Sequence, residues 1–319
     1  MDPGRNGAAR AIDVAALRKT YRGGVEAVKG ISFDVARGEV FGLLGPNGAG
    51  KSTTIGMLTT TVAPTAGRAQ VAGFDVVDDP IGARAASAVV FQDAVVDRSL
   101  TGRRNLELHA RLWGLPPARV ASRIDDVVSR FGLADLVDRE VSTYSGGQRR
   151  RLELARSLLS EPSVLFLDEP TVGLDPRIRH ELLDVIAGLR TTVDMTIVLT
   201  THYLDEAERL CDRVAIMHDG AIVALDRPRA LLAALGDEIV EVTVDAPASL
   251  LLAFLRERSL TNDHAFAIGN TLTLPLRGVS TRDVFDALDV SDFSVVASSS
   301  RPPTLDDVYL DLTGGRLAA

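Results

Sequence analysis

Three short apolar runs in the first two thirds of the chain predict buried parallel strands of one sheet. They are "SAVVFQ", "SVLFLDEP" and "MTIVLTTH", and they are continuously apolar instead of alternating. That pattern is typical of strands covered on both faces. The runs end in Gln92, in Asp168 and Glu169, and in His202. Because ligands of open α/β sheets bind at the carboxyl ends of the strands, we expect these side chains to share one site.

Other patterns predict the surroundings of that sheet. "AIDVAALRKTY" and "GISFDVARGEVFGLLG" read as strands, and "VAIMHDGAIVAL" as a hairpin with Asp219-Gly220 as its turn. Between them, "TGRRNLELHARLWGL" places Leu106, Ala110 and Trp113 on one helical face, and "RVASRIDDVVSRFGL" aligns Val120, Ile124, Val127 and Phe131. The interval thus predicts a helical subdomain at about 93–160, inserted into an α/β domain.

The two ends of the chain differ from this middle part. Residues 1–11 are rich in Gly, Arg and Ala, which predicts disorder. After Gly236 the pattern changes to mixed strands and helices, so we expect the α/β domain to span 12–236 and a small α+β domain to follow at 237–319. In the latter, Thr304 and Asp307 predict a helix cap, followed by an apolar stripe of Leu305, Val308, Tyr309 and Leu312.

Composition narrows the classes of function. The net charge is −8 and the pI about 5.2, which argues against nucleic acid as the main partner. The single cysteine, Cys211, excludes an internal disulfide and fits a reducing compartment. No signal-peptide pattern opens the sequence, and no uncharged apolar run has the length of a membrane span. We therefore expect a protein that does not cross a membrane by itself.

The stretch "GPNGAGKS" fits the pattern G-x-x-x-x-G-K-[ST] between an apolar strand and a helix. Glycines let the backbone turn so that its N–H groups face phosphates, and the helix start favours an anion. Lys51 adds a positive charge, and the Ser52 hydroxyl is suited to Mg²⁺. The loop predicts nucleotide binding through the contiguous residues Gly45, Pro46, Asn47, Gly48, Ala49, Gly50, Lys51, Ser52 and Thr53.

The acidic pair after the run "VLFL" indicates hydrolysis. Asp168 is delivered to the strand end, where its carboxylate suits Mg²⁺. Glu169, next along the chain, is suited to polarise the water that attacks the γ-phosphate. An ordinary acidic strand end is the alternative for this stretch alone, and Lys51 makes it the weaker one.

A second glycine-rich helix start lies in "YSGGQRRRLELARSLL". Ser145, Gly146 and Gly147 precede a helix that carries Leu152, Ala155, Leu158 and Leu159 inward, so its N–H groups can accept an anion. One nucleotide domain does not need two such loops for one triphosphate. From this stretch alone, a glycine-rich cap with a basic helix face is also open, and we read Arg149–Arg151 as a partly solvated face.

Together these motifs resemble the ATP-binding subunits of ABC transporters. The phosphate loop, the signature Ser145-Gly146-Gly147-Gln148, the Asp168-Glu169 pair, "GLDP" at 173–176 and His202 occur in that family's order, over about residues 12–236. The resemblance implies that Tyr21 stacks on adenine, that Gln92 contacts the γ-phosphate and, with Ser52 and Asp168, Mg²⁺, and that Asp175 belongs to the ATP site. Lys51, Gln92, Glu169 and His202 are its expected catalytic residues.

The resemblance also implies partners. Two copies pair head to tail, so that the signature of one closes over the ATP of the other, and they attach to a separately encoded permease at the cytoplasmic face of the membrane. Tyr144 stands where the family usually has Leu, and we expect no loss of activity. Tyr144, "SLTGRRNLELHARLWGLP" and "PTLDDVYLDLTG" resemble the daunorubicin/doxorubicin-resistance type, which implies export of drugs or other hydrophobic compounds.

Two other functions are weighed against this one. A soluble ABC ATPase that acts on ribosomes or nucleic acid usually has two fused nucleotide domains or long coiled-coil insertions, whereas this chain has one set of motifs and is acidic. A P-loop kinase or GTPase would lack the signature, and no N-K-x-D motif is present. His109, His180, His218 and His264 show no ligand spacing, and we expect them to be surface or packing residues.

Overall fold

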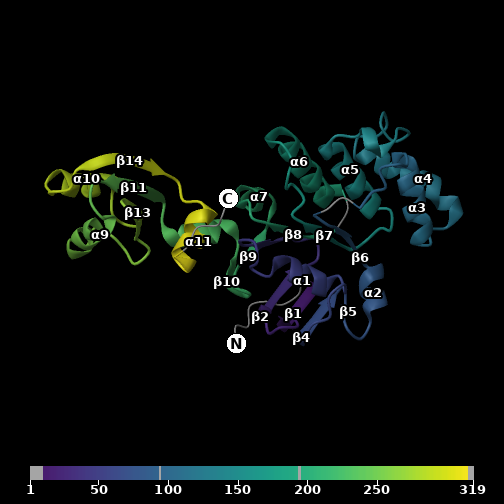
Figure 1. Ribbon diagram of the computed structural model, residues 1–319, viewed down its shortest axis with the longest axis horizontal. Helices are drawn as coiled ribbons and strands as arrows, with labels where there is room; N and C mark the ends of the chain where they lie inside the picture. Colours follow the sequence, from purple (N-terminus) through teal and green to yellow (C-terminus); the bar gives the residue numbers. More distant parts are fainter. Residues whose placement is uncertain (1–9, 93–94, 193–194, 315–319) are drawn as a thin grey trace. The chain divides into compact units, whose positions relative to one another are not determined.

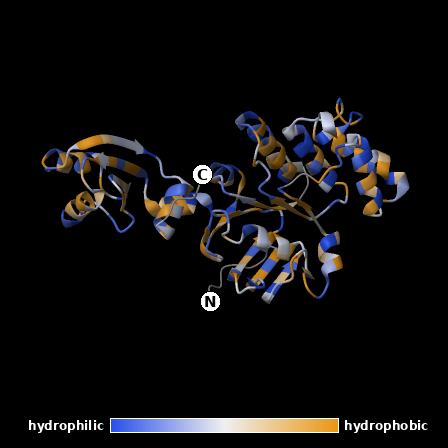
Figure 2. Ribbon diagram, in the orientation of Figure 1, coloured by the Kyte–Doolittle hydropathy of each residue, from blue (hydrophilic) through white to orange (hydrophobic). Residues whose placement is uncertain are grey.

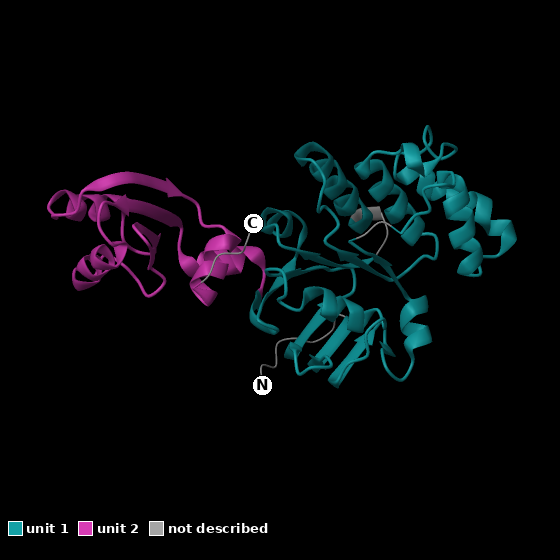
Figure 3. Cartoon of the chain, viewed as in Figure 1, with its two compact units in different colours: residues 1–225 teal, residues 226–319 magenta. Residues whose placement is uncertain are grey.

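The computed structural model describes residues 10–92, 95–192 and 195–314, and these form two compact units, 1–225 and 226–319 (Figure 3). The units divide at Leu225, earlier than the expected boundary at Gly236. The reason is that α8 (Pro228–Leu235) packs against α11 (Leu305–Thr313) and so belongs with the second unit. Of the segment 1–11 expected to be disordered, residues 1–9 lie outside the described ranges, whereas Arg10 and Ala11 begin strand β1.

The first unit is built around a six-stranded sheet of order β10-β9-β3-β8-β7-β6 (Figure 1). Its strands are β3 (Val40–Leu44), β6 (Ser87–Val90), β7 (Val164–Asp168), β8 (Thr196–Thr201), β9 (Arg213–His218) and β10 (Ala221–Asp226). The pairs β3–β8, β3–β9, β6–β7 and β7–β8 are parallel. Every residue of β7 and β8 is buried, as their continuous apolar runs predict, and both strands are mainly hydrophobic in Figure 2. β6 is buried except for the partly exposed Val89, and β3 is buried throughout.

A second, antiparallel sheet of order β2-β1-β4-β5 shares the core of this unit. It contains β1 (Arg10–Thr20), β2 (Glu26–Ala36), β4 (Ala66–Val71) and β5 (Phe74–Asp75). Phe33 of β2 stacks on Phe41 of β3 with ring centroids 5.2 Å apart, so the two sheets meet through aromatic contact. Helices α1 (Lys51–Leu58) and α2 (Pro80–Ala85) follow the phosphate loop and β5.

The interval between Gln92 and β7 is mostly helical, as predicted. It contains α3 (Gly102–Leu112), α4 (Pro117–Arg130), a 3-10 turn (Val141–Thr143) and α5 (Gly146–Ser157), and the three α-helices pack on one another. Leu106 and Ala110 are buried, but Trp113 is 40% exposed, contrary to our expectation. Trp113 lies beyond the last turn of α3 as its C-cap, which takes its side chain off the buried stripe. Ile124, Val127 and Phe131 are buried as predicted.

Two helices complete the first unit. α6 (Pro176–Thr192) follows β7, and α7 (Leu204–Leu210) follows β8. Cys211 comes directly after α7 and is buried against β3, where a Cβ added to Gly42 would lie 2.9 Å from its Sγ. Burial raises the pKa of the Cys211 thiol, so the thiolate is disfavoured. Asp219 and Gly220, both at positive φ, form the predicted tight turn between β9 and β10.

The second unit is an α+β unit with its own core. Its antiparallel sheet has the order β12-β13-β11-β14 and comprises β11 (Glu238–Val244), β12 (Phe266–Ile268), β13 (Thr271–Leu276) and β14 (Val295–Arg301). α9 (Ala248–Glu257) and α10 (Thr281–Asp289) contribute Leu251, Leu255 and Val284 to that core. The predicted capping box of Thr304 and Asp307 begins α11, but Leu312 is 43% exposed and lies outside the buried stripe.

Candidate nucleotide-binding site

The phosphate loop connects β3 to α1 and is held by close backbone packing. A Cβ at Gly45 would come within 2.3 Å of the Met217 carbonyl, and one at Gly50 within 2.4 Å of the Ala27 carbonyl. Both glycines have positive φ, as does Gly48, beside which a Cβ would meet nothing within 4 Å. The loop can therefore form only with glycine at positions 45 and 50. Its exposed tip at Asn47 and Gly48 stays open to a ligand.

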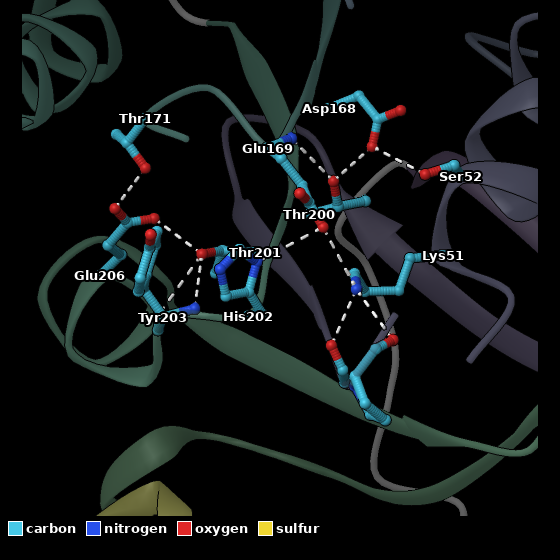
Figure 4. Close-up of polar contacts among 12 residues, drawn as sticks. Lys51, Ser52, Asp168, Glu169, Thr171, Thr200, Thr201, His202, Tyr203 and Glu206 are labelled. Atoms are coloured by element: carbon cyan, nitrogen blue, oxygen red, sulfur yellow. Dashed lines mark hydrogen bonds and ion pairs between the residues drawn. The ribbon is translucent and has the colours of Figure 1, made fainter. Parts of the chain in front are cut away.

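Lys51 is buried at the start of α1. Its Nζ donates hydrogen bonds to the carbonyls of Gly45 (2.8 Å) and Pro46 (3.1 Å) and lies 3.4 Å from Oε1 of Glu169 (Figure 4). The ammonium group thus sits inside the curve of the loop, next to the acidic pair that β7 supplies. A cation in this position can contact the phosphates that the loop N–H groups face.

Ser52 and Asp168 bring two oxygen ligands together. The Ser52 hydroxyl donates to Oδ1 of Asp168 at 3.2 Å, and the Thr200 hydroxyl donates to the same oxygen at 2.6 Å (Figure 4). Hydroxyl and carboxylate oxygens are the donors that Mg²⁺ prefers, and Mg²⁺ commonly takes its other ligands from phosphates and water. The two side chains therefore fit the ion that the sequence predicts.

Glu169 has an uncommon backbone conformation for a residue other than glycine, with φ of 45°. Its N–H donates to Oγ1 of Thr200 at 2.9 Å, and its carboxylate faces both Lys51 and His202. Nδ1 of His202 lies 3.5 Å from Oε1 of Glu169 and is buried without a hydrogen-bond partner in the described residues. Asp168, Glu169 and His202 are thus brought together beside Lys51 and Ser52, as their positions at strand ends predict (Figure 4). Gln92, which the same prediction included, makes no hydrogen bond with this cluster in the described residues.

Thr200, Thr201 and Glu206 hold this arrangement, and sequence reasoning missed all three. Parallel pairing of β7 with β8 places Thr200 opposite Asp168. Glu206 of α7 is fully buried and accepts hydrogen bonds from the hydroxyls of Thr171 (2.5 Å) and Thr201 (2.8 Å), and its carboxylate also pairs with Arg179 at 2.6 Å. It thereby ties the segment after Glu169 to the segment before His202 (Figure 4). The sequence offered one signal, for Glu206: it is a charged residue on the same helical face as the apolar Leu210.

Other predicted residues lie apart from that cluster. The Tyr21 hydroxyl is 3.4 Å from Oγ1 of Thr53, which places the exposed ring beside the start of α1. Gln92 is exposed after β6, and within the described residues no hydrogen bond joins it to Ser52 or Asp168. The side chain of Asp175 caps α6 by accepting from the N–H of Ile178 at 3.1 Å.

The signature forms a second helix start. Ser145 and Gln148 make a capping box, in which the Gln148 N–H donates to Ser145 Oγ and the Ser145 N–H donates to Gln148 Oε1. Among the described residues, no hydrogen bond or ion pair joins Ser145–Gln148 to the phosphate loop. Gly147 packs so closely on α6 that a Cβ would lie 2.2 Å from the Ile178 side chain. Tyr144 is buried, and its hydroxyl donates to the Leu136 carbonyl at 2.5 Å, which satisfies its polar end.

The histidines outside the site have local contacts. Burial, with a smaller contribution from Arg156, lowers the pKa of His109 to about 4, and its ring lies 5.9 Å from that of Trp113. Nδ1 of His180 is 2.8 Å from the Pro176 carbonyl, and His264 pairs with Asp311. Within the described ranges, no helix combines the length and the apolar character that a membrane crossing requires.

Comparisons with known proteins agree with this geometry. Residues 28–172 match the family model described as ABC transporter. The chain is 40% identical to the daunorubicin/doxorubicin resistance ATP-binding protein DrrA of Streptomyces peucetius, over 96% of this chain and 93% of that protein. It is 39% identical to the Nod factor export ATP-binding protein I of Ralstonia nicotianae, over 95% of this chain and 94% of that one.

Solved structures give the same fold. The structure of cbiO1 from Clostridium perfringens, part of the ABC transporter complex cbiONQ, has a TM-score of 0.66 and 30% identity, over 70% of this chain and 91% of that chain. The names of the two relatives refer to drug resistance and to export, and neither name supports a soluble ATPase that acts on ribosomes or nucleic acid. The chain therefore belongs to the ABC transporter family, as one of its nucleotide-binding ATPase subunits.

Proposed function

We propose that this ATPase works as a homodimer that drives a separately encoded permease, exporting drugs, antibiotics or other hydrophobic compounds. Each ATP would lie between the phosphate loop of one copy and Ser145–Gln148 of the other. At the start of α5 the capping box occupies the N–H groups of Ser145 and Gln148. The N–H groups of Gly146 and Gly147 are then available to a phosphate held by a second copy.

The main support for a homodimer is the second glycine-rich helix start, at Ser145–Gln148. It has the features of an anion site, yet in the described residues nothing bonds it to its own phosphate loop. A head-to-tail pair gives both loops a function on the same ligand. The differential affinity of such a pair for ATP and for its hydrolysis products would drive the switch between closed and open forms.

Within the site, contacts between side chains support the proposed roles of Lys51, Ser52, Asp168 and Glu169, and the family resemblance supports those of Tyr21 and His202. Lys51 and the loop N–H groups bind the phosphates, and Tyr21 packs on the base. Bound Mg²⁺, held by Ser52 and Asp168, would offset the negative charge of the phosphates. The Glu169 carboxylate accepts a proton from the attacking water or orients it, and His202 contacts the γ-phosphate. Thr200 keeps Asp168 and Glu169 in register.

The proposed substrate class rests on the relatives, whose names refer to daunorubicin resistance and Nod factor export. The proposed place of the chain is the cytoplasmic face of the membrane, held there by the permease. To test both, the chain is expressed with and without the membrane-protein gene adjacent to its own. We expect recovery with membranes, and lowered accumulation of a fluorescent anthracycline, only when both genes are present.

The control for export is Lys51→Ala, which should stay membrane-bound with its permease but leave anthracycline accumulation at the level of empty cells. Membrane recovery that does not depend on the permease would contradict the proposed partnership. Membrane recovery without any effect on anthracycline accumulation would support the partnership and exclude anthracyclines as substrates.

A further inference from the structure

Arg150 is the one member of Arg149–Arg151 that is buried. We expected the three arginines to form a partly solvated face, but Arg150 is 6% exposed. Arg149 bonds to the nearby Tyr144 carbonyl at 2.5 Å, and Arg151 pairs with Glu181 of α6 at 2.6 Å, both partly exposed. A buried guanidinium without strong compensation is costly, so its partners define what it does.

Those partners are backbone carbonyls of the nucleotide site. The Arg150 guanidinium donates to the carbonyls of Phe91 (2.5 Å), Pro170 (2.8 Å) and Asp168 (3.4 Å). Phe91 immediately precedes Gln92, and Asp168 and Pro170 flank Glu169. One side chain therefore bonds to the backbone on both sides of Glu169 and directly before Gln92.

Glu153 completes this contact from the next turn of α5. Its Oε2 accepts from Arg150 Nη1 at 3.0 Å, and its Oε1 accepts the N–H of Val95 at 2.6 Å. The side chain is almost fully buried, so the pair is shielded from water. Arg156 of the same helix donates to the Val95 carbonyl at 3.0 Å. The helix that starts at Ser145 is thus bonded to the chain on both sides of Gln92.

From these contacts we infer that Arg150, with Glu153, is a positioning residue for hydrolysis. It sets the distance between the Gln92 and Glu169 backbones and links both to the signature helix. The planar guanidinium is what allows three carbonyls to be bonded in fixed directions, which a lysine ammonium cannot do. Any displacement of α5 is transmitted by these bonds to Gln92 and Glu169. The inference rests on the proposed roles of those two residues.

The test uses Arg150→Lys in the full-length chain with its permease. Lysine keeps the buried positive charge beside Glu153 but cannot bond to all three carbonyls. We expect the dissociation constant for a fluorescent ATP analogue to stay within about twofold, because Lys51 and the loop are unchanged. The kcat of ATP hydrolysis should fall at least about tenfold, the scale of a misplaced reacting group. Arg151→Lys is the matched control, with wild-type binding and kcat.

Two results would overturn the inference. One is a wild-type kcat in Arg150→Lys, which would show that charge alone suffices. The other is weakened ATP binding in proportion to the lost kcat, which would show a general structural role. If Arg150→Lys does not fold, Glu153→Gln is the second variant. We expect it to lower kcat several-fold while the affinity for ATP stays unchanged. A wild-type kcat in Glu153→Gln would overturn the inference. Wild-type turnover in Glu169→Gln would instead refute the proposed role of Glu169, independently of Arg150.

Discussion

Nζ of Lys51 lies 3.4 Å from Oε1 of Glu169, and the two side chains are only 4% and 7% exposed. The cation of the phosphate loop and the acid at the end of β7 therefore form a buried pair. Removing either member leaves the other buried without its counter-charge, which costs more than the loss of a surface pair. We expect substitution of Lys51 to weaken ATP binding and substitution of Glu169 to slow hydrolysis.

For Lys51→Ala we expect ATP affinity to fall by at least about tenfold, because a charge-assisted contact to the phosphates is lost. Titration with a fluorescent ATP analogue measures this. Lys29→Ala is the matched control, since Lys29 pairs with exposed Asp219 at the surface and its loss should leave affinity unchanged. Equal affinities in wild type and Lys51→Ala would show that the loop is not the phosphate site.

For Glu169→Gln we expect retained ATP binding and a kcat lower by about 10²-fold or more, because the amide cannot accept the proton of the attacking water. The measurement is phosphate release under saturating ATP. Glu161→Gln, at an exposed position, serves as the control. Turnover near the wild-type rate would mean that another group activates the water.

Thr200→Val removes a buried hydroxyl while keeping the shape of the side chain. It should lower the free energy of unfolding by about 1–3 kcal/mol, because the Asp168 carboxylate and the Glu169 N–H each lose a partner. It should also lower kcat. Thr196→Val on the same strand loses one bond from the Gly38 N–H and should be destabilised without a change in kcat. Equal kcat values for the two variants would show that Thr200 is not needed to place the acids.

His109 makes stability depend on pH. Burial lowers its pKa from 6.5 to about 4, so between these values the unfolded chain binds a proton that the folded chain does not. The free energy of unfolding should therefore fall as the pH is lowered from about 6.5 toward about 4. In His109→Gln this part of the pH dependence should disappear, as measured by denaturant midpoints at pH 7.5 and pH 5. Exposed His180→Gln is the control, and an unchanged pH dependence in His109→Gln would contradict the assignment.

The sequence predicts the nucleotide-binding core well because its signals are local. Strands buried on both faces read as unbroken apolar runs, and β3, β7 and β8 are such strands. Their polar ends identify Asp168, Glu169 and His202, which the parallel arrangement then gathers at one edge. The phosphate loop is equally easy to recognise in the sequence. Its Gly45 and Gly50 cannot be replaced without clashes with backbone carbonyls, so both glycines of the motif are present.

The supporting residues were not predictable because their roles depend on pairing between distant segments. Thr200 looks like any β-branched strand residue until the register sets it opposite Asp168. Arg150 looks like its two neighbours until α5 packs against the ends of β6 and β7. The predicted burial of Trp113 and Leu312 was wrong for a related reason. Helical spacing does not show where a helix stops covering the core.

The burial of Cys211 has a practical consequence. It is the chain's only cysteine, it is shielded against β3, and its thiolate is disfavoured. Maleimide reagents, which react with thiolates, will therefore label a cysteine introduced on the surface in preference to the native one. A spin label or dye at exposed Ser142, close to the signature, can report distances between the two copies of the proposed dimer in the otherwise unmodified chain.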